Sequence, residues 1–308
     1  MNQREHPAAR VHTDHGPDWT YLGWQGWGFA CPSHWNPVVL GESRREGSTV
    51  LADLDGPRLE LTWQTRPRRK RADLARTLEQ QTARLTGRIE RHELAECECG
   101  EFETSELVYD RDLRGALLAL ASPATQRAAV LRLSLKGVDQ PMSVARAIVA
   151  SLDDYADDQP NPWAIYGLAF WQPPRFTLTL RNVLAGSTRL GFASGRTTLS
   201  FWRVSLRTCG DLQDKPEKHF ARAVGRKERR WYRFDTSRRT LADHHVTVTA
   251  GRMPVYRWPG QWPRRQLLSW SWRCPQSEQI YEVAATGWHV PSRLVEDAAA
   301  GLLCHLPL

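Results

Sequence analysis

The chain has 308 residues, 41% of them hydrophobic, and a formal net charge of +8. This composition is globular, and the length is roughly twice that of an average domain, so two cores are expected. No apolar run is long enough for a secretory signal or a membrane-spanning helix, which predicts a cytoplasmic protein without a transmembrane segment. The cysteines have no recurring spacing, so we expect reduced and mostly buried thiols at Cys31, Cys97, Cys99, Cys209, Cys274 and Cys304.

The charge is distributed unevenly between the two halves of the chain. Residues 1–158 contain 20 Lys or Arg and 24 Asp or Glu, whereas residues 159–308 contain 22 and 10. A cationic second half indicates an acidic partner for that half specifically.

The first half is predicted to form hairpin strands, a helix, further strands and a closing helix. Apolar residues alternate with polar ones along 59–63, and Gly-containing turns bend the strands back. An apolar stripe predicts a helix over 72–85, and a proline ahead of an apolar face predicts a closing helix over 141–155. The acidic, proline-bearing stretch 153–163 is interpreted as a linker.

The second half repeats this order of elements. Leu178 and Leu180 alternate with polar residues in a strand, and Pro216 begins a helix predicted over 216–224. A further proline-initiated helix is predicted over 291–306. Each half therefore starts with hairpins and ends with a helix.

An internal duplication accounts for the shared order. The stretches "GSTVLADLDGPRLELTW" (47–63) and "GSTRLGFASGRTTLSFW" (186–202) share landmarks at an offset of 139, and Leu117 matches Leu267 at an offset of 150. About eleven residues are therefore inserted in the second copy after Trp202. The repeated turns are interpreted as hairpin corners and not phosphate loops, because strand sequence follows them. In this interpretation turns begin at Gly47, Gly186, Gly56 and Gly195, and the two cores are closed by Trp63 and Trp202.

The element order and the opening "P-x-x-W" and "P-x-F" strands resemble the family that groups PsbP with the Ran-binding Mog proteins. The resemblance implies an α+β fold of two tandem homologous domains, each an antiparallel sheet covered by helices, in a pseudo-two-fold arrangement. It implies an N-terminal extension over 1–22, a first repeat over 23–157 and a strongly basic second repeat over 158–308. Such domains are similar to non-catalytic binding or assembly modules, so no cofactor is implied.

Catalytic signatures are absent from the sequence, which contains no nucleophile elbow, zincin, Walker or dinucleotide motif. His92, Cys97 and Cys99 form an incomplete ligand set for a metal. His244 and His245 are expected on opposite faces of a strand, so they do not share one ligand. We expect no catalytic residue and no metal site, with a hidden hydrolase or metalloenzyme as the remaining alternative.

The strongest functional signal is a basic and aromatic region of the second half. Arginines with aromatic residues between them neutralise phosphates and stack on bases, and they also anchor acidic protein surfaces. A solvated surface in a tryptophan-rich protein is the structural alternative. The candidate binding residues are Arg226, Lys227, Arg229, Arg230, Trp231, Tyr232, Arg233, Arg238, Arg239, Arg257, Trp258, Trp262, Arg264 and Arg265.

These observations predict a non-enzymatic binding or assembly protein that uses this surface to engage an acidic protein partner. The alternative is a nucleic-acid-binding protein that uses the same residues, although no known nucleic-acid fold motif accompanies them. The sequence alone does not name the partner or the oligomeric state.

Overall fold

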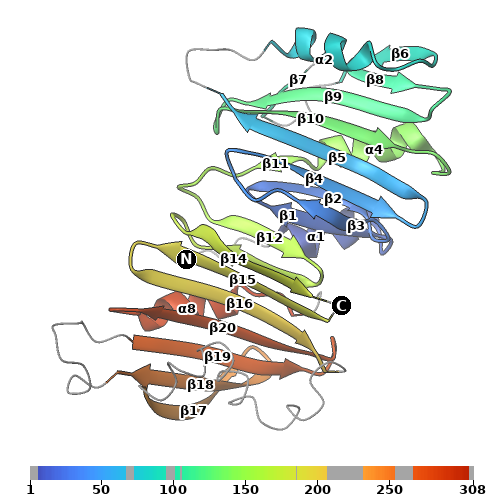
Figure 1. The fold of residues 1–308 in the computed structure, drawn as a ribbon. Helices are drawn as coiled ribbons and strands as arrows, with labels where there is room; N and C mark the ends of the chain where they lie inside the picture. Colours follow the sequence, from blue (N-terminus) through green and yellow to red (C-terminus); the bar gives the residue numbers. More distant parts are fainter. Residues whose placement is uncertain are drawn as a thin grey trace. The chain divides into compact units, whose positions relative to one another are not determined.

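The described part of the chain is mainly β, with 55% of its residues in strands and 14% in helices, and these strands form three antiparallel sheets (Figure 1). Contacts divide the chain into two units, which we call the first unit (Pro7–Ile165) and the second unit (Tyr166–Leu308 with Met1–His6). The computed structural model describes residues 6–66, 73–94, 101–104, 106–184, 186–206, 232–253 and 266–304.

The sequence analysis predicted sheets covered by helices, which overestimates the helix content. Helices form where predicted, but as the short segments α2 (Leu74–Thr82), α4 (Pro141–Ala150) and α8 (Ser292–Ala300). A helix of nine residues is about 14 Å long, which is the width of about three strands. The two large sheets have seven and eight strands, so each helix covers only part of a face. The helix predicted over 216–224 lies outside the described residues.

The first unit contains one small and one large sheet. It begins with α1 (Pro7–His15), which the sequence did not predict and which packs on β1. The small sheet has the order β11-β2-β1-β12, and the large one has the order β3-β4-β5-β10-β9-β8-β6, with β7 also paired to β9. The strands are β1 (Trp19–Trp24), β2 (Trp27–Pro32), β3 (Asn36–Leu40), β4 (Glu46–Asp53), β5 (Gly56–Thr65), β6 (Ile89–His92), β7 (Glu103–Thr104), β8 (Leu107–Asp110), β9 (Gly115–Ser122), β10 (Arg127–Ser134), β11 (Asp153–Asp154) and β12 (Asn161–Ile165).

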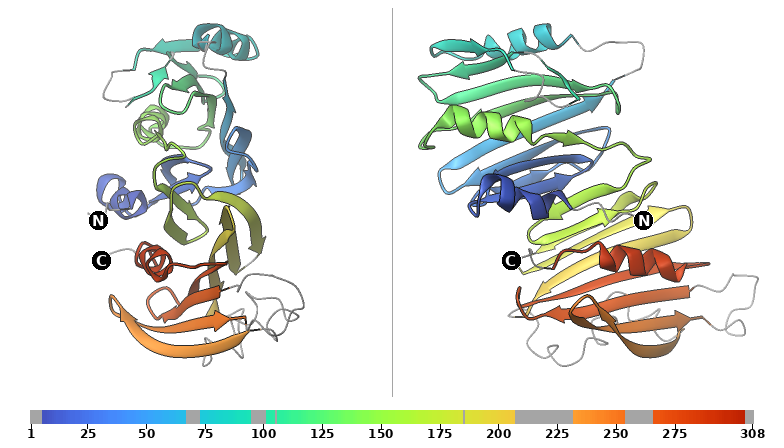
Figure 2. Two further views of the ribbon diagram at one scale, coloured as in Figure 1. Left: turned by 90° about the vertical axis from the view of Figure 1, so that its left-hand side faces the viewer. Right: turned by 180° about the vertical axis from the view of Figure 1, so that it is seen from behind.

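The second unit is built on a seven-stranded sheet in the order β14-β15-β16-β20-β19-β18-β17. Helix α8 packs on β19 and β20 and buries Val295, Ala298 and Ala299 (Figure 2). β13 (Leu168–Gln172) lies outside this sheet. The seven strands of the sheet are β14 (Thr177–Leu184), β15 (Ser187–Ser194), β16 (Thr197–Ser205), β17 (Arg233–Leu241), β18 (His244–Arg252), β19 (Gln266–Cys274) and β20 (Gln279–Gly287).

The two large sheets have the same path of the chain. In each large sheet, three consecutive strands form a meander, β3 to β5 in the first unit and β14 to β16 in the second. The last strand of the sheet along the chain then pairs with the third strand of the meander, β10 with β5 and β20 with β16. The remaining strands then follow in reverse order to the far edge. A helix directly follows the last strand of each large sheet, α4 after β10 and α8 after β20.

The repeated glycines serve as turns at three of the four positions. Gly56, Gly186 and Gly195 have positive φ angles of 125°, 75° and 55° and lie at hairpin turns. Gly47 is instead the second residue of β4, opposite Trp63, and a Cβ atom there would lie 2.7 Å from the indole. The expected corner at Gly47 is therefore wrong: this glycine makes room for a buried ring.

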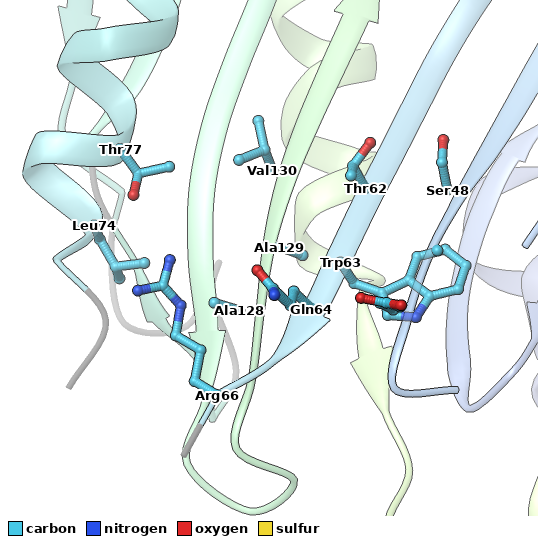
Figure 3. Close-up of a pocket in the computed structure, with 12 residues that line it drawn as sticks. Ser48, Thr62, Trp63, Gln64, Arg66, Leu74, Thr77, Ala128, Ala129 and Val130 are labelled. Atoms are coloured by element: carbon cyan, nitrogen blue, oxygen red, sulfur yellow. The ribbon is translucent and has the colours of Figure 1, made fainter. Parts of the chain in front are cut away.

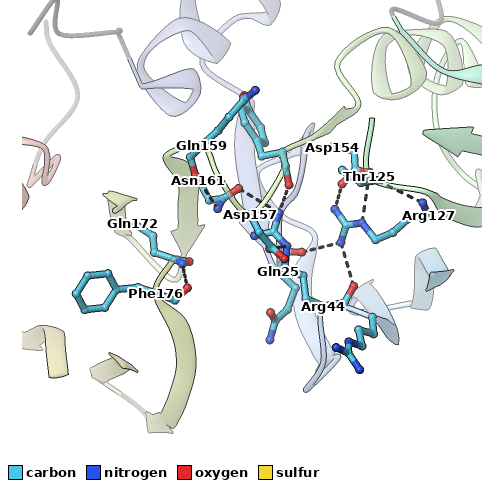
Figure 4. Close-up of polar contacts among 12 residues, drawn as sticks. Gln25, Arg44, Thr125, Arg127, Asp154, Asp157, Gln159, Asn161, Gln172 and Phe176 are labelled. Carbon is cyan, nitrogen blue, oxygen red and sulfur yellow. Dashed lines mark hydrogen bonds and ion pairs between the residues drawn. The ribbon is translucent and has the colours of Figure 1, made fainter. Parts of the chain in front are cut away.

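A buried ion pair anchors the stretch 153–163 within the first unit (Figure 4). Asp154 lies on β11 and forms an ion pair with the Arg127 guanidinium, and both side chains are almost completely buried. The same guanidinium donates to the carbonyl oxygen of Gln25 at 2.8 Å, and Arg44 pairs with Asp157 at 2.6 Å. This stretch, interpreted from sequence as a linker, thus contributes a paired strand to the small sheet.

Candidate functional site

The β17–β18 hairpin carries the described part of the predicted basic region. β17 pairs with β18 along its whole length, from Arg233 opposite Arg252 to Leu241 opposite His244. All of its residues from Arg233 to Thr240 are exposed. β17 ends the strand order of the seven-stranded sheet, and within the described residues no strand pairs with its outer edge.

Strand alternation divides the arginines of β17 between two faces of the sheet. Arg238 lies opposite Thr247, in register with Ser271 and Glu282 across the sheet. Arg239 lies on the other face, where its guanidinium is 5.8 Å from the centre of the Trp270 ring. The strand therefore presents positive charge in both directions.

The aromatic residues of the hairpin pack and do not stand alone at the surface. Tyr232 is buried against Leu267 and Met253. Phe234 is 36% exposed, and its ring stacks on that of Tyr232 at 5.9 Å. Tyr232 therefore supports the base of the hairpin, while the arginines provide its exposed surface.

The other predicted binding residues lie outside the described residues, and so do Cys97 and Cys99. His92 is described at the end of β6, where its Nε2 is 3.6 Å from a carboxylate oxygen of Glu90. The undescribed candidates are Arg226, Lys227, Arg229, Arg230, Trp231, Arg257, Trp258, Trp262, Arg264 and Arg265.

A buried carboxyl group lies in register with Arg238. Glu282 on β20 is 2% exposed and accepts a hydrogen bond from the Ser269 hydroxyl at 2.9 Å, while its second carboxylate oxygen has no hydrogen-bond partner. Burial raises the pKa of Glu282 to about 7, although Ser269 and the charge of Arg189 act in the opposite direction. The carboxyl group is therefore poised to change charge near neutral pH.

The first unit has an open groove of ≈ 630 Å³ on its large sheet, beside the start of α2 (Figure 3). Asp73 caps α2 by accepting a hydrogen bond from the backbone N–H of Arg76 at 3.0 Å. The groove is lined mainly by apolar side chains, including the indole of Trp63, together with polar ones, Arg66 and Glu46, and its described lining residues include no histidine or cysteine. Its main described side chains are Ser48, Thr62, Gln64, Leu74, Thr77 and Val130.

The most concentrated chemistry in the second unit is a thiol–imidazole cluster of His244, Cys274 and Cys304. Their ligand atoms all lie within 4.8 Å of one another, and the Cys304 sulfur is 3.1 Å from Nε2 of His244. The other ring nitrogen, Nδ1, is 2.6 Å from a carboxylate oxygen of Asp243. The sequence analysis missed this cluster because its three members come from the start of β18, the end of β19 and the segment after α8.

Burial keeps the Cys304 thiol protonated. It raises the pKa of Cys304 to about 12, and the adjacent Cys274 acts in the same direction, while a hydrogen bond with Trp272 opposes the shift. The backbone around Cys304 is fixed, because its carbonyl oxygen accepts from the Tyr281 hydroxyl at 3.0 Å and Leu303 bridges to Ala169. Cys304 is therefore a protonated thiol at neutral pH when no cation is bound.

The sequence matches no known protein family, and no characterised protein shows significant similarity to it. Among the described residues, no helix has both the length and the apolar character needed to cross a bilayer.

Proposed function

We propose that this protein is a non-enzymatic binding or assembly protein whose second unit engages an acidic protein partner through the β17–β18 hairpin. The proposal includes two tandem homologous domains of the PsbP and Mog type, the first serving as scaffold and the second carrying the binding surface. It is assigned to the cytoplasm.

The exposed edge strand β17 is the observation that carries the proposal. An edge strand offers backbone N–H and C=O groups to which an extended segment of a partner can add as a further strand. Arg238 and Arg239 lie on opposite faces of this strand, so each flanks such an added segment on one side. Carboxylates at two consecutive positions of the partner strand, one on each face, would pair with them, which gives both charge recognition and register.

The common path of the two large sheets supports the tandem arrangement. Seven strands in the same order, each set followed directly by a helix, fit two copies of one ancestral fold. The far edge of the sheet is formed by β6 in the first unit and β17 in the second. β6 has four residues, whereas β17 has nine and carries three arginines. The copies thus differ in strand length and charge at the edge to which we assign binding.

Charge reversal on β17 tests the proposal. The tagged full-length protein and its Arg238→Glu/Arg239→Glu variant are incubated with native extract at low salt, and bound proteins are identified by mass spectrometry. Both residues are exposed, so folding should be unaffected. We expect on the order of tenfold less recovery of a specific acidic protein with the variant, which is the ratio that about 1.4 kcal/mol produces.

The matched control changes the same charge elsewhere. Arg84 and Arg88 are exposed in the first unit, and their double reversal should leave recovery unchanged. Equal loss in both variants would show that net charge alone attracts the partner. A nucleic acid as the main bound species, with affinity falling steeply with salt, would replace the protein partner with the alternative function.

A further inference from the structure

We infer that His244, Cys274 and Cys304 bind one Zn²⁺ ion, which fastens the segment after α8 to the ends of β18 and β19. This site goes beyond the binding function proposed above and does not depend on it. The residue types fit the metal, because two thiolates and one imidazole bind Zn²⁺ in preference to harder cations.

The distances between the ligand atoms are close to those of a tetrahedral site. Zn–S bonds of about 2.3 Å and Zn–N bonds of about 2.0–2.1 Å place neighbouring ligands about 3.5–3.8 Å apart. The three atoms already lie within 4.8 Å of one another, and the Cys304 sulfur is 3.1 Å from Nε2 of His244. Displacements of less than about 1 Å bring them to bonding positions around one ion.

Asp243 prepares the imidazole for metal binding. Its carboxylate lies 2.6 Å from Nδ1 of His244, so the proton stays on Nδ1 and the lone pair of Nε2 faces the two sulfurs. A carboxylate in this position is the usual outer partner of a zinc-bound histidine, and it also increases the basicity of the ligand. His244 itself is buried, which fixes the ring in place.

The environment of the sulfurs suits a neutral complex. Cys274 is fully buried and Cys304 is half-buried, so two isolated thiolates would be costly here. Zn²⁺ forms two S–Zn bonds and one N–Zn bond, the two thiol protons pass to solvent, and the resulting charges cancel. Because Cys304 is only half-buried, a water molecule can complete the tetrahedron as the fourth ligand.

The site would have a structural role. Cys304 follows α8 and the bridge between Leu303 and Ala169, whereas His244 and Cys274 end two neighbouring strands of the large sheet. One ion therefore joins three segments that are about thirty residues apart along the chain. Metal binding should stabilise the second unit in proportion to the logarithm of free metal concentration.

Cobalt titration of the reduced, metal-free full-length protein tests this inference. Tetrahedral Co²⁺ bound by thiolates gives intense near-ultraviolet charge-transfer bands and visible d–d bands. We expect one equivalent of Co²⁺ to produce both and one equivalent of Zn²⁺ to remove them. The bands should be lost, or affinity should fall at least tenfold, in Cys274→Ser and Cys304→Ser.

Two controls separate this site from the other cysteines. Cys31→Ser changes a buried thiol of the first unit, and a Cys97→Ser/Cys99→Ser variant removes the sequence-predicted ligand pair; both should bind as wild type does. Asp243→Asn should weaken binding by about 10- to 100-fold while leaving the spectrum unchanged. Cys304 is half-buried, so its serine variant is expected to fold, as circular dichroism can verify.

The inference is overturned if the reduced wild-type protein gives no thiolate charge-transfer band. It is equally overturned if the band persists in both Cys274→Ser and Cys304→Ser, or if it disappears in the Cys97→Ser/Cys99→Ser variant alone.

Discussion

The ion pair between Arg127 and Asp154 should be the main polar anchor of the first unit's small sheet. Arg127→Met keeps most of the side-chain volume but leaves the Asp154 carboxylate, which is almost fully buried, without its cation. The Thr125 hydroxyl remains as a hydrogen-bond donor to that carboxylate, and the carbonyl oxygen of Gln25 loses its donor (Figure 4).

Removing one partner of a buried pair costs about 3–5 kcal/mol, because an uncompensated charge stays in a low-dielectric interior. A unit of this size loses roughly 2–4 °C in melting temperature per kcal/mol, so the transition should fall by roughly 6–20 °C. The double variant Arg127→Met/Asp154→Leu removes both charges and should recover most of this loss, since apolar replacements of buried pairs are often neutral.

Urea unfolding followed by circular dichroism and tryptophan fluorescence provides the assay, with the m-value checked for each variant. Arg91→Met is the matched control, because Arg91 pairs with Glu79 at 2.8 Å on an exposed surface and should cost less than about 1 kcal/mol. A loss below about 1 kcal/mol for Arg127→Met would refute the reasoning. So would a double variant that is less stable than either single variant.

Two further predictions concern buried positions. The pKa of Glu282 is about 7 in the folded protein, against an ordinary value of 4.5, so the folded state binds the proton more tightly than the unfolded state. The contribution of this group to stability is therefore fully present below about pH 4.5 and is lost as the pH rises to about 7. Glu282→Gln should therefore be more stable than wild type at pH 8, by roughly 3 kcal/mol, and about equal to it near pH 4, which unfolding curves at both pH values can check. Equal stabilities at pH 8 would show that the carboxyl group is not desolvated. Gly47→Ala places a Cβ atom 2.7 Å from the Trp63 ring and should lower the free energy of unfolding by about 1–3 kcal/mol, as measured by thermal unfolding. In the control Gly115→Ala, the Cβ atom meets nothing closer than 3.5 Å, so the loss should be smaller. Equal losses in the two variants would mean that the indole moves aside freely.

Local patterns in the sequence predicted local structure well. The apolar stripe over 72–85 contains α2, and the proline-initiated segments over 141–155 and 291–306 contain α4 and α8. Alternation and Gly turns marked the hairpin of β15 and β16, where Gly195 has a positive φ angle. These features depend on neighbouring residues alone, so periodicity and turn chemistry are enough to find them.

Features that depend on distant partners could not be found in this way. The acidic stretch 153–163 has the composition of a linker, but Asp154 lies in a strand that pairs with β2 and forms an ion pair with the buried Arg127. α1 lacks a strong apolar pattern and packs on β1, so tertiary contact decides its conformation. Helix coverage was overestimated because an apolar face reveals that a helix is buried, but not how many strands lie beneath it.

The chemistry of the second unit shows the same division. Arg238 and Arg239 were selected as candidates because basic residues cluster in the sequence, and both lie on an exposed strand. The cluster of His244, Cys274 and Cys304 has no short-range spacing motif. Sheet pairing and the return of the chain after α8 bring these three side chains together, and a single sequence does not reveal that proximity.

Photo-cross-linking from Ser237 tests the central claim most directly. Ser237 lies exposed in the middle of β17, one residue before Arg238. With a photoreactive amino acid at this position, irradiation in native extract should yield one dominant adduct with an acidic protein. The yield of this adduct should fall on the order of tenfold in the Arg238→Glu/Arg239→Glu background. The same group at Leu113, 54% exposed in a turn of the first unit, should not yield that adduct. An equal adduct from both positions, or none from Ser237, would contradict the assignment of β17 as the binding surface.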